Sequence, residues 1–116
     1  MHAREQEHQV IIDAMRACFL PYSEAEESIY DCGVRRKFPN GMRCDLFFYK
    51  SVNILRFNRG AWMVKQEPML GLLFDEVLGV IAKIKIHSVD TIKEKAIPHL
   101  ITKIANYPSG IGALTT

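Results

Sequence analysis

The stretch VRRKFPNGMR, residues 34–43, places four cationic side chains around one turn in a chain whose net charge is only +2. Residues 34–65 hold eight basic side chains and one acidic side chain. Residues 1–33 hold two basic and seven acidic ones, and residues 66–116 hold five of each. Neighbouring cations add their fields and attract anionic partners. The sequence therefore predicts a basic surface in the middle of the chain.

Aromatic side chains are interleaved with these cations. On a β-sheet, such a combination suits single-stranded nucleic acid, because cations follow the phosphates and rings stack on the bases. The residues expected to contact nucleic acid are Arg35, Arg36, Lys37, Arg43, Lys50, Arg56, Arg59, Tyr49 and Trp62. Two alternatives stay open, since cations on edge strands also discourage aggregation, and the acidic first third could neutralise the basic segment internally.

Other chemistry has little support in the sequence. The four histidines and three cysteines form no spacing typical of a metal site or of a disulfide framework, and no glycine-rich phosphate loop occurs. The cysteines are expected to be free thiols in a reducing compartment. We predict no metal, no cofactor and, more generally, a protein that is not an enzyme.

The elements that must position the basic segment follow from periodicity. Residues 4–19 have the apolar spacing of an amphipathic helix. Turn signals at 39–41 and 58–60 then separate stretches rich in β-branched and aromatic residues. We expect a meander with strands at about 32–38, 42–50, 52–57 and 61–65. In the second strand, Met42, Cys44, Leu46 and Phe48 should share one face, and Arg43, Asp45, Phe47 and Tyr49 the other.

The last third indicates helices. Pro68 suits a first helical turn, and apolar residues up to Ile81 then recur at helical spacing. Residues 83–87, KIKIH, alternate as in a strand but could also end that helix. Residues 89–107 predict a second helix with a kink at Pro98.

The predicted fold class is therefore α+β. It has an N-terminal helix, an antiparallel three- to four-stranded β-meander and two C-terminal helices packed on one face of the sheet, with the basic groups on the opposite face. Residues 1–107 should form a single compact domain, and residues 108–116 a mobile C-terminal tail. Apolar runs are far shorter than the roughly 20 residues needed to cross a bilayer. We expect a cytoplasmic protein that does not enter a membrane.

One element order has a known counterpart. If the fourth meander strand is left out and 83–86 is a strand, the order α-β-β-β-α-β-α resembles the restriction-endonuclease-like fold. That resemblance implies a magnesium-binding acid at Asp45, in GMRCDLFF, and a second acid at Glu7 on the first helix. The next strand, VNILRF, has no Asp or Glu where the family carries one. The resemblance thus implies a nuclease domain that is divergent or inactive.

The sequence leaves three hypotheses. The first is a small non-catalytic binding protein whose basic, aromatic-bearing sheet contacts nucleic acid. The second is a protein-interaction module, such as an inhibitor or immunity-type partner, acting through the acidic N-terminal third or the apolar helix after Pro68. The third is the nuclease-like domain. A homodimer is compatible with each of them, because the segment after Pro68 has more apolar surface than a small core can cover.

Overall fold

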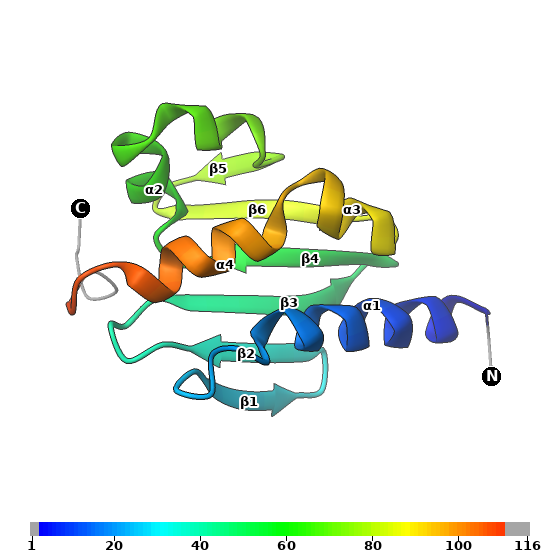
Figure 1. The fold of residues 1–116 in the computed structure, drawn as a ribbon. Coiled ribbons are helices and arrows are strands. Elements are labelled where there is room, and N and C mark those ends of the chain that lie inside the picture. The colour runs from blue at the N-terminus through cyan, green and yellow to red at the C-terminus, as the bar shows by residue number, and fades with distance from the viewer. Residues whose placement is uncertain (1–2, 111–116) are drawn as a thin grey trace.

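Six strands form one antiparallel sheet in the computed structural model, which describes residues 3–110 (Figure 1). The strands are β1 (Glu26–Tyr30), β2 (Gly33–Lys37), β3 (Arg43–Tyr49), β4 (Val52–Phe57), β5 (Glu76–Leu78) and β6 (Ile81–Ile86). Their spatial order is β1-β2-β3-β4-β6-β5. β2, β3 and β4 match three of the four strands predicted for the meander, whereas β1 was not predicted. β6 and β5 extend the sheet beyond β4 as a hairpin.

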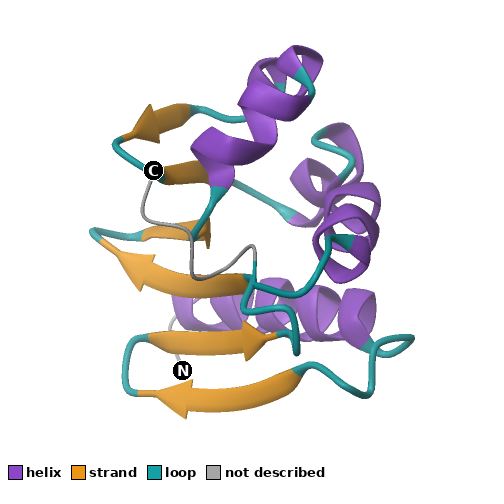
Figure 2. Ribbon diagram, turned by 90° about the vertical axis from the view of Figure 1, so that its left-hand side faces the viewer, coloured by secondary structure: helices purple, strands orange, loops and turns teal. Residues whose placement is uncertain are grey.

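The helices lie on one side of this sheet, and the other side carries none within residues 3–110 (Figure 2). They are α1 (Ala3–Phe19), α2 (Gly60–Gln66), the 3-10 helix η1 (Pro68–Leu72), α3 (Val89–Glu94) and α4 (Ile97–Asn106). The predicted α+β class is confirmed, with six strands in place of three or four. None of the described helices combines the length and the apolar character needed to span a membrane.

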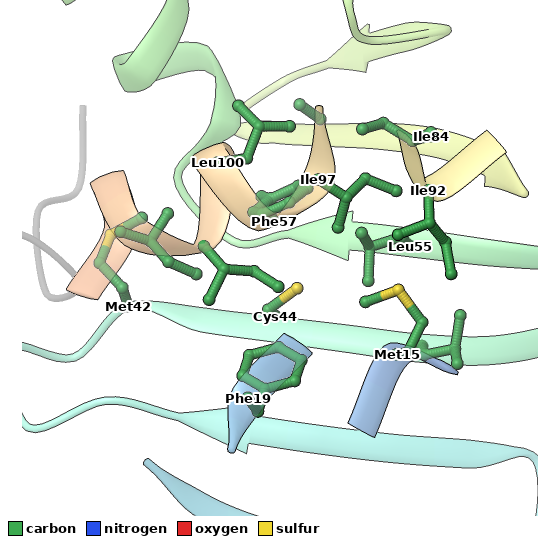
Figure 3. Close-up of a cluster of buried hydrophobic side chains, with 14 of the residues drawn as sticks. Met15, Phe19, Met42, Cys44, Leu55, Phe57, Ile84, Ile92, Ile97 and Leu100 are labelled. Atoms are coloured by element: carbon green, nitrogen blue, oxygen red, sulfur yellow. The ribbon is translucent and has the colours of Figure 1, made fainter. Parts of the chain in front are cut away.

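The core lies between the sheet and the helices (Figure 3). Leu55 and Phe57 of β4 point from the sheet toward Ile97 and Leu100 of α4, and all four are fully buried. Met15 of α1 lies over the same face. This arrangement follows from period-2 alternation in the strands and period-3.6 spacing in the helices, which each place apolar side chains on one side. The predicted apolar face of β3 is confirmed, since Met42, Cys44 and Leu46 are buried.

The fourth predicted strand, residues 61–65, is wrong. These residues belong to α2, in which Gly60 and Met63 are both buried, as expected for positions three apart on a helix. A Cβ on Gly60 would lie 2.0 Å from the Cβ of Ala82 in β6. The close packing of α2 on β6 thus depends on glycine at this position.

The predicted helix from Pro68 to Ile81 is also wrong. Its first residues form η1, residues 73–75 form a loop, and the remainder forms β5, the β5–β6 turn and the start of β6. Gly79 has a φ of 60° in the β5–β6 turn, a conformation that glycine adopts without strain. Strand pairing also places Ala82, Ile84 and Ile86 in the core. A continuous helix could not bury all three, because residues two apart lie on different sides of a helix.

Residues 83–86 form a strand, as one of the two alternatives predicted. The helical segment 89–107 divides into α3 and α4 at Ala96, whose φ of 51° ends the first helix, and not at Pro98. Pro98 lies in the first turn of α4, where its missing N–H has no partner to lose. The predicted tail begins at residue 108, and most of it lies outside the described residues.

Candidate functional site

The side of the sheet without helices is called the open face here. Strand alternation places on it the strand side chains that point away from the helices. Its members are Glu26, Ser28, Tyr30, Arg35, Lys37, Arg43, Asp45, Phe47, Tyr49, Val52, Ile54, Arg56, Glu76, Leu78, Ile81, Lys83 and Lys85. Six of them are cations and three are acids, so the predicted basic surface lies on one continuous face.

Three charged side chains meet at the centre of this face, and we call them the open triad. Arg35, Asp45 and Arg56 are register neighbours on β2, β3 and β4. Arg35 donates from Nε to Asp45 Oδ1 at 2.9 Å, and Arg56 donates from Nη2 to Oδ2 at 3.1 Å. The hydrogen bond to Asp45 raises the pKa of Arg35. Asp45 is therefore held by two cations, and the triad as a whole keeps one positive charge.

Each aromatic ring of the open face has a cation over it. The guanidinium carbon of Arg35 lies 5.4 Å from the ring centroid of Tyr30, and that of Arg56 lies 5.2 Å from the centroid of Phe47. Lys50, in the β3–β4 turn, lies 5.3 Å from the ring of Tyr49. Tyr49 is 54% exposed and Tyr30 is 51% exposed, so both rings can reach a ligand.

Four cations of the open face form no ion pair with any described residue: Lys37, Arg43, Lys83 and Lys85. They lie on both sides of the open triad, on β2, β3 and β6. The Nε of Arg43 is also buried without a hydrogen-bond partner in this part of the chain. These four side chains supply most of the positive charge of the face, because the open triad keeps only one net positive charge.

The open face is hollowed on both sides of Phe47. One hollow of about 380 Å³ extends toward β1 and is lined by Tyr30, Gly33 and the open triad. The other, of about 530 Å³, extends toward β6 and is lined by Tyr49, Lys83 and Lys85. Both volumes lie within the roughly 300–1,000 Å³ typical of ligand sites.

The structure brings together five of the nine residues predicted to contact nucleic acid: Arg35, Lys37, Arg43, Arg56 and Tyr49. Lys50 borders the face in the β3–β4 turn, and Arg59 lies between β4 and α2. The two remaining residues, Arg36 and Trp62, lie elsewhere. Trp62 of α2 packs edge-on against Tyr107, with ring centroids 4.7 Å apart.

Arg36 points to the side of the helices, because it follows Arg35 in the same strand. There it donates to Glu27 Oε2 at 2.7 Å, and Arg16 of α1 binds the same carboxylate. We call Arg16, Glu27 and Arg36 the covered triad. The hydrogen bonds that Arg16 donates to the Glu27 carboxylate lower the pKa of Glu27. Part of the acidic first third is thus paired internally, as one alternative predicted.

Glu7 and Asp45, the two acids implied by the nuclease resemblance, lie on opposite sides of the sheet. Glu7 is on α1 beside Phe48 and Asn53, which point toward the helices, and Asp45 is on the open face. The two carboxylates therefore cannot ligate one metal ion. Within residues 3–110, no group of three or more His, Cys, Asp or Glu side chains could hold a metal.

Tyr30, Lys83 and Lys85 join the face without having been predicted as site residues. The alternation of KIKI gave a signal for the two lysines, since Ile84 and Ile86 were candidates for the core. Tyr30 gave none, because it belongs to β1 and residues 26–30 were not among the predicted strands. Its position on the open face follows from pairing with Gly33.

No protein-family model matches this chain, and no curated protein or solved structure matches it either. The fold and the geometry of the open face are therefore what bears on function.

Apolar side chains are exposed at the other end of the sheet. Met69 and Leu72 of η1 are 73% and 74% exposed, and Leu78 of β5 is 64% exposed. β5 is an edge strand in the part of the chain that the structure describes. The expected protein partner and homodimer stay predictions.

Proposed function

We propose that this protein binds single-stranded nucleic acid on the open face, without catalysis. The observation that carries the proposal is that the helices cover one face of the sheet, while the other presents unpaired cations and exposed rings together. An uncovered sheet of this kind suits an extended strand, in which phosphates meet Lys and Arg and bases stack on rings.

The shape of the face favours a single strand over a duplex. Six strands about 4.8 Å apart make a surface roughly 24 Å across. The major groove of B-DNA is about 12 Å wide and admits a helix or a two-stranded ribbon, so this sheet cannot enter it. Bases must also be unstacked before they can reach Tyr30, Phe47 or Tyr49, and unpaired strands meet that condition at low cost.

The cations are spread widely enough to follow a backbone. Lys37 and Arg43 lie at one end of the strands, and Lys83 and Lys85 lie on β6, beyond the open triad. A strand that crosses the sheet from β2 to β6 would pass Phe47 on its way. The proposal therefore predicts that the cations at the two ends of this path, such as Lys37 and Lys85, contribute independently to the affinity for nucleic acid.

A salt series of fluorescence-anisotropy titrations with short oligo(dT) and oligo(U) tests this proposal. The informative variant is Lys37→Glu with Lys85→Glu, since both side chains are exposed and unpaired in the described structure. The matched control is Lys65→Glu with Lys93→Glu on α2 and α3, where the side chains are also exposed. Both double variants change the net charge by the same amount.

We expect the open-face variant to bind at least about tenfold more weakly and to lose about 1.4 from the slope of log affinity against log salt, since each phosphate contact contributes about 0.7. The control variant should remain close to wild type. If the two variants weaken binding equally, net charge and not the open face is responsible. Absence of binding at low salt would contradict the proposal outright.

A further inference from the structure

We infer that the hollow between Tyr30 and Phe47 is a slot for one unpaired nucleobase, with guanine as the preferred base; this inference rests on the proposed function. The hollow has a volume of about 380 Å³, near the lower limit for small-molecule sites. Its lining combines rings, a backbone floor and the charged groups of the open triad.

The floor and walls follow from strand register. Tyr30 pairs with Gly33, and Gly33 pairs with Phe47, so the three residues form one row across β1, β2 and β3. Glycine leaves the middle position of this row without a side chain. The two aromatic positions are therefore separated by two strand spacings, about 9.5 Å. A planar ring with a contact distance of about 3.5 Å on either side fits in that gap.

The gap cannot be filled by substitution, because backbone packing requires glycine in the middle of the row. A Cβ on Gly33 would lie 2.0 Å from the carbonyl oxygen of Leu46 and 2.7 Å from the Cα of Phe47. The close approach of β2 and β3 thus fixes both the sheet and the hollow. The fold itself keeps the slot open.

The open triad supplies polar groups at the side of the slot. Arg35 and Arg56 are donors only, and Asp45 is an acceptor. A carboxylate has about four acceptor positions, and the three hydrogen bonds from the arginines leave about one for a ligand. Guanine suits this set, because O6 and N7 accept from arginine and the N1–H can donate to a carboxylate.

The guanidinium groups also extend the stacking surface. Arg35 lies over Tyr30 and Arg56 lies over Phe47, at 5.4 Å and 5.2 Å from the ring centroids. Planar groups of both kinds therefore surround the hollow, and each of them can stack on a base. The second hollow is lined by Phe47 and Tyr49, which are neighbours along one strand and not members of one cross-strand row.

The test compares fluorescein-labelled oligo(dT) with the same strand carrying a single dG at its centre. Wild type should bind the dG strand about tenfold more tightly, the scale of one good base contact. Phe47→Leu keeps an apolar side chain but loses the stacking ring, so it should bind both strands equally. Tyr49→Leu is the control, since Tyr49 lies outside the slot, and it should retain the preference.

Cys32 gives a second readout that needs no variant. Its side chain is exposed at the hollow, whereas Cys18 is half-buried and Cys44 is buried. We expect the dG strand to slow alkylation of Cys32 by iodoacetamide, with oligo(dT) having less effect. Guanosine monophosphate is added as a separate arm. If guanosine monophosphate protects Cys32 as well as the dG strand does, the slot is supported and the guanine that it binds comes from a free nucleotide.

Equal affinity for the two strands, together with an unprotected Cys32, would overturn the slot. In that case, salt-dependent binding that the Lys37 and Lys85 variants weaken would leave the proposed function intact. If neither strand binds at low salt and Cys32 reacts at the same rate throughout, both inferences fail together.

Discussion

Two triads of similar charge, each with two cations and one anion, lie on opposite faces of the sheet. In each, one carboxylate is held between two arginines: Glu27 between Arg16 and Arg36, and Asp45 between Arg35 and Arg56. Arg35 and Arg36 are consecutive in β2, so alternation alone sends them to different triads. The comparison teaches that the role of a cation here depends on which face its side chain occupies.

The covered triad connects the helix layer to the sheet. Arg16 comes from α1, whereas Glu27 and Arg36 come from β1 and β2, so these ion pairs bind a helix to the sheet. The guanidinium of Arg36 also lies 5.3 Å from the ring centroid of Phe19 and donates to the carbonyl oxygen of Ala25. We therefore interpret the covered triad as a structural contact that holds α1 on the sheet.

The open triad joins three strands that the backbone already pairs. Its arginines are about a third exposed, at 29% and 33%, and the carboxylate between them is 10% exposed. No helix packs over it in the part of the chain described. The carboxylate of the covered triad is 21% exposed, so the triads differ in what they join and not in how deeply they are buried. The open triad joins no helix to the sheet, and its arginines are accessible from the open face.

Reversing the charge of each arginine in β2 should separate the two roles most strongly. Arg36→Glu places two carboxylates together in a partly buried site, and we expect it to lower the free energy of unfolding by about 3 kcal/mol. Arg35→Glu should cost about 1 kcal/mol, because the new side chain can turn toward water and no contact between a helix and the sheet is lost, whereas Arg36 also contacts Phe19 and the carbonyl of Ala25. Urea unfolding followed by circular dichroism measures both.

The exposed control for this pair is Lys37→Glu, two residues after Arg35 on the same face. It should change the free energy of unfolding by less than about 0.5 kcal/mol. Equal losses for Arg35→Glu and Arg36→Glu would show that the two faces do not differ as the comparison requires.

The acid dependence of stability should come in part from the covered triad. The folded pKa of Glu27 lies below its unfolded value, so its contribution is present above the unfolded pKa and is lost as pH falls through the folded one. At pH 7, Glu27→Gln should therefore cost about 1.5 kcal/mol. The difference from wild type should begin to shrink near about pH 4, where the unfolded glutamate becomes protonated, and should disappear once the carboxylate is protonated in the folded state as well.

Urea midpoints measured between neutral and strongly acid pH test this expectation. Glu24→Gln is the control, because Glu24 is exposed and forms no ion pair within the described residues. A difference for Glu27→Gln that stays constant across the pH range would mean that the loss has another origin than the carboxylate charge.

Neutralising the carboxylate of the open triad should have the smallest effect, and it should strengthen nucleic-acid binding. Asp45→Asn keeps the shape of the side chain but leaves Arg35 and Arg56 without their anion. On the proposed function, oligo(dT) affinity should rise about threefold, and the salt slope should steepen by up to about 0.7. Anisotropy titrations check this, with Glu27→Gln as the control on the covered face. Weaker oligo(dT) binding by Asp45→Asn would contradict a phosphate-binding role for the arginines.

Much of the fold could be predicted from local patterns. The helix 4–19 and the strands near 33–37, 43–49 and 52–57 follow from apolar periodicity and turn residues, and the structure has them within a few residues. The same patterns correctly assigned Cys44 and Leu46 to the core and Asp45 and Phe47 to the other face. These predictions succeed because alternation along a single strand is a local property.

The failures occurred where a pattern fits two structures. The residues from 68 to 81 are so apolar that helical spacing can be found among them, yet β5 and β6 form because β4 offers an edge for pairing. Likewise, residues 61–65 gave a strand by composition, but α2 forms because Gly60 allows a helix to pack on Ala82. Both outcomes depend on partners distant in the sequence.

By itself, the sequence determined the basic segment, the apolar faces of the strands and the α+β class, because each of these depends on residue type and short-range spacing. The tertiary structure alone decided which cations act together. Register across β2, β3 and β4 pairs Arg35 and Arg56 with Asp45, and it places Tyr30 and Phe47 on either side of Gly33. Such neighbours come from strand pairing over long chain separations, which no local pattern encodes.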